Sequence, residues 1–242
     1  MHILESMGLR RFPKLTFGVF VVTAVVNVLQ WLVPGTLARL ERTSSGLHGD
    51  WWRSGTALFV QDGGFAGATL NLAFLLALGM LAEQVLPQSR WLLQYFGIGL
   101  VVEFIAYAWQ PVGGGNSIAD CGLAGGLAVA LWRRDERLPR WSLTVIMLWS
   151  AAMFATLGDR AWLPAVLGCA LLVGPANLMA ARGLDLRRPI AGLLALVGLV
   201  LAAAANIHGA ALILGTAAAA GSATGGQHRR QETSPSTQGS PA

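Results

Sequence analysis

A serine and a histidine are the two residues of this very apolar chain that could together perform catalysis. Ser117 follows three consecutive glycines in "PVGGGNSIADCG", and His208 interrupts a long uncharged run in "AANIHGAA". A serine hydroxyl becomes a nucleophile when a base within hydrogen-bond reach takes its proton, and histidine most often serves as that base. Ionisable groups within membrane segments are costly and are functional candidates for that reason. The sequence therefore suggests a Ser117–His208 pair, provided that the fold brings the two residues together.

Each of these residues also has a simpler interpretation. The stretch "SIAD" fits a capping box, in which Ser117 is the N-cap and Asp120 occupies the third helical position. His208 could lie at the membrane surface and bond to a neighbouring carbonyl. No metal, disulfide, phosphate-binding or nucleic-acid motif competes with these interpretations, and we expect no cofactor.

The composition is that of a polytopic membrane protein of the all-α class. Hydrophobic residues make up 54% of the chain and charged residues 12%, whereas a soluble domain carries about 25% charged residues. Apolar runs close to the roughly 20 residues that cross a bilayer recur along the chain. The predicted spans cover residues 15–34, 65–86, 91–110, 117–132, 142–157, 162–181, 189–205 and 207–221.

The last two predicted spans divide a single uncharged run, residues 189–221. At about 1.5 Å per residue the run would measure near 50 Å as one helix, too long for a hydrocarbon core of about 30 Å. We therefore divide it at Asn206 and His208, which gives eight spans. A single helix would instead give seven spans, and the helix that carries His208 would run in the opposite direction.

The distribution of positive charge orients the chain in the membrane. With the N-terminus inside, the predicted inner segments hold thirteen arginine and lysine residues and the outer segments hold four, as the positive-inside rule requires. The net charge of +5 thus indicates topology and not nucleic-acid binding. In this arrangement Ser117 and His208 both lie near the outer ends of their helices, which run parallel because they are four spans apart.

The sequence predicts one membrane domain with two polar ends. Residues 1–14 form a cytoplasmic N-terminus, residues 15–221 form the membrane domain, and residues 222–242 form a polar tail. The tail is rich in Gly, Ser, Thr, Pro and Gln, a composition that predicts disorder. Sixteen arginines against one lysine indicate a GC-rich genome, and we expect a bacterial cytoplasmic (inner) membrane protein.

Small residues flank both candidate catalytic residues. Gly122, Gly125 and Gly126 follow Ser117, and Gly122 and Gly126 have the GxxxG spacing. Alanines and Gly215 follow His208 in the same way. Such residues allow two membrane helices to approach closely, as a serine–histidine pair requires.

Taken together, these features resemble the rhomboid family of intramembrane serine proteases. "GNSIADCGLAG" resembles the family's G-x-S-G motif and the glycine-rich helix after it, and "HGAALILG" resembles the last core helix, which opens with the catalytic histidine. "GDWWRSGTALF" resembles the tryptophan–arginine motif of the first outer loop, at Trp52 and Arg53. "FAGATLNLAFLLALGMLAE" resembles the second core helix, with Asn71 at the oxyanion asparagine and Gly79 and Glu83 in a G-x-x-x-E ending.

The resemblance implies a rhomboid-like helix bundle that cleaves transmembrane proteins within the lipid bilayer, without a cofactor, a metal or nucleic acid. Ser117 would be the nucleophile and His208 the general base and acid. Asn71 and the backbone near Ser117, at Gly115, would hold the oxyanion. The glycine loop would let backbone donors come close and adjust around a substrate.

The chain also departs from the family pattern. Gly67 and Asp62 stand where the family usually has histidines, and Ile118 replaces the glycine after the serine. Three predicted helices, instead of one, separate the serine helix from the histidine helix. Two other functions therefore remain open: an inactive relative that binds membrane helices as a chaperone or scaffold, and a small transporter that uses Glu103 and Asp120. Glu103 itself could be a cavity residue or a hydrogen-bond partner between helices.

Overall fold

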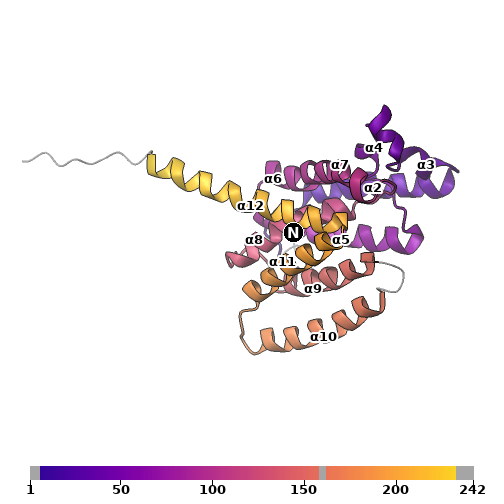
Figure 1. The fold of residues 1–242 in the computed structure, drawn as a ribbon. Coiled ribbons are helices and arrows are strands. Elements are labelled where there is room, and N and C mark those ends of the chain that lie inside the picture. The colour runs from indigo at the N-terminus through magenta and orange to yellow at the C-terminus, as the bar shows by residue number, and fades with distance from the viewer. Residues whose placement is uncertain (1–5, 158–161, 233–242) are drawn as a thin grey trace, which may run out of the picture.

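The computed structural model is an all-helical bundle, and it describes residues 6–157 and 162–232 (Figure 1). The helices that build the bundle are α2 (Lys14–Leu32), α5 (Gly64–Val85), α6 (Gln88–Leu92), α7 (Ile98–Trp109), α8 (Ser117–Trp132), α9 (Ser142–Met153), α10 (Trp162–Ala181), α11 (Arg187–Ala203) and α12 (Ile207–Glu232). A π-helical turn, η2 (Leu93–Gly97), joins α6 to α7. Short helices α3 (Thr36–Leu40), η1 (Ser44–His48) and α4 (Arg53–Thr56) lie between α2 and α5, and η3 (Phe154–Leu157) follows α9.

Helices cover every segment that the sequence predicts as a span. Within the described residues, three helical segments are long and apolar enough to cross a membrane, namely Lys14–Leu32, Gly64–Val85 and Gln88–Trp109. Shorter apolar helices follow at Ser117–Trp132, Ser142–Met153 and Ile207–Gly221. The structure thus supports a polytopic helical membrane protein.

The long uncharged run near the C-terminus is two helices, as predicted. Helix α11 ends at Ala203 and α12 begins at Ile207. Between them Ala205 takes a left-handed backbone conformation with φ 52°, which reverses the chain. The prediction of a break at Asn206 is confirmed.

Helix α12 extends further than the sequence predicts. It continues past residue 221 to Glu232 and leaves the bundle (Figure 1). The first part of the tail that we predict to be disordered, residues 222–232, is therefore helical in the structure. Residues 233–242 lie outside the described residues.

Helix α8 lies at the centre of the bundle. It contacts α5, α7, α11, α12 and the π turn η2, and every residue from Ile118 to Ala128 is buried. A helix that is apolar on all sides is covered by other helices or by lipid, and α8 is covered by the helices around it. Helix α10 lies at the edge of the bundle, packed against α9 (Figure 1).

The G-x-x-x-E ending of α5 fixes α2 against it. The Glu83 carboxylate accepts hydrogen bonds from the backbone N–H and the hydroxyl of Thr16, at 2.6 and 2.7 Å. A Cβ at Gly79 would lie 2.6 Å from Thr16 Cγ2, so only glycine allows this approach. Because Thr16 lies in the first turn of α2, the carboxylate also satisfies one of the N–H groups that a helix leaves unpaired there.

The tryptophan–arginine motif organises the segment between α2 and α5. The Arg53 guanidinium donates to the carbonyl oxygens of Ala38 at 2.8 Å and Glu41 at 3.1 Å, and it lies 5.1 Å from the ring centroid of Trp52. Arg53 therefore ties α4 to the end of α3, and Trp52 shields one face of the guanidinium.

Candidate active site

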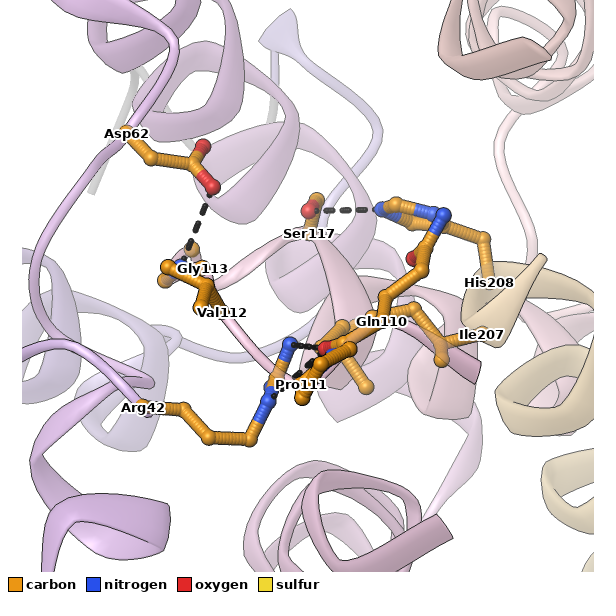
Figure 2. A pocket seen from close by; sticks show the side chains of 12 residues that line it. Arg42, Asp62, Gln110, Pro111, Val112, Gly113, Ser117, Ile207 and His208 are labelled. Carbon is orange, nitrogen blue, oxygen red and sulfur yellow. Dashed lines mark hydrogen bonds between the residues drawn. The ribbon is translucent and has the colours of Figure 1, made fainter. Parts of the chain in front are cut away.

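The structure brings Ser117 and His208 into direct contact. Ser117 Oγ lies 2.9 Å from His208 Nε2, a hydrogen-bond distance (Figure 2). Ser117 is the first residue of α8, and His208 is the second residue of α12. Two helices far apart in the sequence therefore begin at the same point.

The capping-box interpretation of Ser117 is wrong. Asn116 occupies the N-cap position of α8, and no side chain caps the helix there. The Ser117 hydroxyl is engaged by His208 instead. Asp120 does not return to the backbone either, because its Oδ2 accepts a hydrogen bond from Asn116 Nδ2 at 2.9 Å.

Glycines hold α8 and α12 close enough for this contact. A Cβ at Gly125 would lie 2.4 Å from the backbone nitrogen of Thr216, and a Cβ at Gly215 would lie 2.6 Å from the carbonyl oxygen of Gly122. Of the predicted GxxxG pair, Gly122 lies against Gly215 of α12, whereas Gly126 faces Leu86. The glycines of α8 that meet α12 are therefore Gly122 and Gly125.

The Gly125 contact gives a direct stability prediction. Gly125→Ala is expected to lower the free energy of unfolding by about 1–3 kcal/mol, because the new methyl group overlaps the α12 backbone. Thermal unfolding in detergent measures the effect. The matched control is Gly192→Ala in α11, where a Cβ would meet nothing within 4 Å. Equal behaviour of the two variants would show that the helices have room to separate.

The glycine loop before Ser117 is fixed by hydrogen bonds. Gly113 and Arg42 exchange backbone hydrogen bonds of 3.1 and 2.9 Å. Gly114 accepts from the Asp62 backbone at 3.1 Å and donates to the Asp62 carboxylate at 3.1 Å. A Cβ at Gly114 would lie 2.7 Å from Val60 Cγ2, so the loop packs closely on the preceding segment. These contacts hold the loop in place, and its adjustment around a substrate stays a prediction.

Gly115 does not present a free N–H to an oxyanion in this structure, because its N–H donates to the carbonyl oxygen of Ala57 at 2.9 Å. A Cβ at Gly115 would lie 3.4 Å from Ser117 Oγ and 3.6 Å from Asn71 Nδ2. Gly115 thus leaves space where the hydroxyl of Ser117 and the amide of Asn71 approach one another.

A polar network, which the sequence analysis missed, positions Asn71. Asn71 Nδ2 donates to Gln61 Oε1 at 2.7 Å, and the Gln61 side-chain amide donates to Asn116 Oδ1. Asn116 in turn donates to the Asn71 carbonyl oxygen at 3.3 Å. The network closes a ring among three buried or half-buried amides beside the nucleophile. The only sequence signal for Gln61 is a polar residue directly after the apolar "ALFV".

Asn206 contacts the second nitrogen of the histidine ring. Its Oδ1 lies 2.7 Å from His208 Nδ1 and accepts from the His208 backbone N–H at 3.0 Å. In the sequence, Asn206 marks only the break between two helices. Its position two residues before the histidine was the available signal.

A cavity opens beside the serine. Its volume is about 470 Å³, and it is lined by Arg42, Asp62, Ser117, Ile118, Ile207, His208 and the loop from Gln110 to Gly115 (Figure 2). Ile118, at the position of the usual glycine, is 3% exposed and forms part of the wall.

Gly67 leaves open space, because a Cβ there would meet nothing within 4 Å. Across the described residues, no group of histidine, cysteine and carboxylate side chains is arranged to hold a metal ion.

Glu103 is neither a cavity residue nor a partner between two long helices. Its carboxylate forms a buried ion pair with Arg42, which comes from the segment between α3 and η1. The same guanidinium donates to the carbonyl oxygen of Gln110 at 2.8 and 3.2 Å. Arg42 therefore connects Glu103 of α7, Gln110 directly after α7, and Gly113 of the glycine loop at the wall of the cavity.

Comparison with known families agrees with this architecture. A model of the rhomboid domain matches residues 48–171, just over half of the 242-residue chain. Searches of curated proteins and of solved structures find no match. The matched region contains Asn71 and Ser117, whereas His208 lies beyond it, after the additional helices. The chain belongs to the rhomboid family, and it is an integral membrane protein.

Proposed function

We propose that the protein is an intramembrane serine endopeptidase of rhomboid type that cleaves transmembrane proteins. The observation that carries this proposal is the 2.9 Å contact between Ser117 Oγ and His208 Nε2 at the wall of a cavity. In this reaction Ser117 Oγ attacks the scissile carbonyl carbon, and Nε2 takes the hydroxyl proton. The imidazolium then protonates the leaving amine as the peptide C–N bond breaks. Water, deprotonated by the same nitrogen, hydrolyses the acyl-enzyme.

We expect two donors near Ser117 to hold the oxyanion, namely its own N–H and the Asn71 side chain. The N–H groups of the first turn of α8 have no partner within the helix, and that of Ser117 is among them. Asn71 Nδ2 uses one of its two hydrogens toward Gln61 and retains the other for the substrate. Gln61 thus orients the side chain that stabilises the transition state.

The proposed topology has eight spans with the N-terminus inside. Helices α8 and α12 both begin at the site, as parallel helices do, and this is the relation expected of helices four spans apart. The Ser117–His208 pair then lies toward the outer face, within reach of a transmembrane substrate. We place the protein in a bacterial cytoplasmic membrane on the basis of its arginine-rich composition.

The test is labelling with a fluorophosphonate probe, which reacts only with an activated serine. Purified wild-type protein in liposomes is expected to be labelled, and Ser117→Ala is expected to remain unlabelled at the same protein concentration. Absence of labelling in a folded wild-type protein would contradict the proposal.

A catalytically inactive, helix-binding relative is the second candidate. The observation in its favour is the lack of histidines at positions 62 and 67, where Asp62 bonds to the glycine loop and Gly67 leaves open space. Binding of a transmembrane peptide that is unchanged in Ser117→Ala, together with unlabelled wild-type protein, would support it. A transporter is less favoured, because Glu103 and Asp120 are engaged by Arg42 and Asn116.

The open space at Gly67 predicts a gain of function. Gly67→His is expected to raise the cleavage rate by about tenfold, a part of the roughly 10²–10³ that one well-placed oxyanion donor is typically worth, because the histidine enters open space that does not fix its orientation. Gly67→Ala is the matched control, since it adds a Cβ without a donor. Cleavage of a reconstituted transmembrane substrate measures both. If the histidine variant is no faster than the alanine variant, residue 67 does not reach the oxyanion.

A further inference from the structure

We propose that Asn206 is a positioning residue that fixes the tautomer and orientation of His208, so that the site works as a Ser117–His208 pair oriented by Asn206. The proposal rests on the proposed protease function and adds a third member that the serine–histidine pair does not require. It begins from the position of Asn206, which is 3% exposed in the turn between α11 and α12.

The orientation of the Asn206 amide is determined by Thr156. Asn206 Nδ2 lies 3.0 Å from the carbonyl oxygen of Thr156 and 3.1 Å from its hydroxyl. A carbonyl oxygen can only accept a hydrogen bond, so the NH₂ group of the amide must face Thr156. The amide oxygen must then face His208.

The amide oxygen in turn determines where the imidazole proton lies. Asn206 Oδ1 is 2.7 Å from His208 Nδ1, and because an amide oxygen only accepts, Nδ1 must carry the hydrogen. In the neutral ring Nε2 then has a free lone pair. This lone pair is directed at Ser117 Oγ, 2.9 Å away, as a general base requires.

Helix capping alone does not account for this arrangement. Asn206 Oδ1 also accepts from the His208 backbone N–H at 3.0 Å, which is the usual contact of an N-cap asparagine. A cap requires neither the contact with the imidazole nor the pair of bonds to Thr156 in η3. The segment that follows α9, within the part of the chain that separates the serine helix from the histidine helix, thus supplies a group that orients the site.

The experiment compares Asn206→Ala, Asn206→Asp and Asn206→Ser with the wild type. Serine caps a helix but is too short to hold the imidazole, whereas aspartate retains an acceptor oxygen at the same distance. Nitrogen-15 NMR of the histidine rings in detergent reports the tautomer, with His208→Gln used for assignment. Fluorophosphonate labelling and substrate cleavage report the rate, and thermal unfolding shows that each variant is folded.

We expect the Nδ1–H tautomer in the wild type and in Asn206→Asp, and its loss in both Asn206→Ala and Asn206→Ser. Reactivity is expected to fall by about 10²-fold in the alanine and serine variants and to be partly restored by aspartate. An unchanged tautomer in Asn206→Ala, or a rate within about twofold of the wild type, would overturn the proposal. If the tautomer shifts as expected but the wild type does not react with the probe, the positioning role stands and the protease function fails.

Discussion

The His208→Ala variant is expected to react with a fluorophosphonate and to cleave a transmembrane substrate about 10⁴-fold more slowly than the wild type. The reason is the contact between His208 Nε2 and the serine hydroxyl. Without the imidazole, Ser117 retains its proton when it attacks, and the leaving amine receives none. The effect belongs to the chemical step, so it appears in kcat and not in substrate binding.

The cavity beside Ser117 and His208 allows a rescue experiment on the His208→Ala variant. Removal of the imidazole enlarges a space of about 470 Å³ that His208 already lines. Imidazole added to the buffer is expected to enter that space and to restore part of the rate in His208→Ala. It is expected to restore nothing in Ser117→Ala, where the nucleophile itself is missing.

The matched control for this variant is His48→Ala. His48 is exposed at the end of η1, where it bonds to the carbonyl oxygen of Ser44, so its replacement is expected to leave the rate unchanged. If His208→Ala retains the wild-type rate, the histidine is not the base and the proposed mechanism is wrong.

The helices could be predicted because their signals are local, and the approach of Ser117 to His208 followed from the order of the helices along the chain. Each predicted span corresponds to an apolar run or to part of one, and the thickness of the bilayer core limits how such runs can be divided. The division of residues 189–221 followed from length and from the two polar residues inside the run, and the structure confirms it. With the break there, the helices that carry Ser117 and His208 are four spans apart and run parallel. Because both residues begin their helices, they are expected on the same side of the membrane.

The rotation of helix α8 could not be predicted from spacing. Gly122, Gly125 and Gly126 lie on neighbouring faces of one turn, and the GxxxG pattern favours the pair Gly122–Gly126. The structure instead directs Gly125 at α12 and Gly126 at Leu86. Which small residue faces which neighbour depends on how every surrounding helix packs, and that information is not contained in one segment.

The polar residues that orient the site were missed for a related reason. Gln61, Asn116 and Asn206 each look like ordinary residues of a loop or helix end. Their roles come from partners that are distant in the sequence, such as Asn71 for Gln61 and Thr156 for Asn206. A buried amide must find such partners, but the sequence does not say which ones.

The second large effect is expected from Arg42→Ala, which should lower the free energy of unfolding by about 3–5 kcal/mol. The side chains of Arg42 and Glu103 are 2% and 0% exposed. Removal of the guanidinium leaves the Glu103 carboxylate buried without its counter-ion, and the carbonyl oxygen of Gln110 loses its two donors as well. The loss of stability comes chiefly from the Glu103 carboxylate, which stays buried without a counter-ion.

A double variant separates the stranded charge from the lost packing. Arg42→Ala combined with Glu103→Gln removes both charges and is expected to recover a large part of the lost stability. The matched control is Arg134→Ala, whose ion pair with Asp185 is 53% and 40% exposed and is expected to contribute no more than about 1 kcal/mol. Thermal and denaturant unfolding in detergent measure all three variants.

The same variants distinguish an ion pair that builds the site from a transport site at Glu103. If Glu103 serves the fold, Glu103→Gln alone leaves Arg42 stranded and is expected to destabilise the protein, and the double variant is expected to be more stable than either single variant. If Arg42→Ala is no less stable than Arg134→Ala, the pair contributes little to the fold, and the wall that it forms beside Ser117 must be held by other contacts. A loss of flux without a loss of stability in Glu103→Gln would favour a transporter.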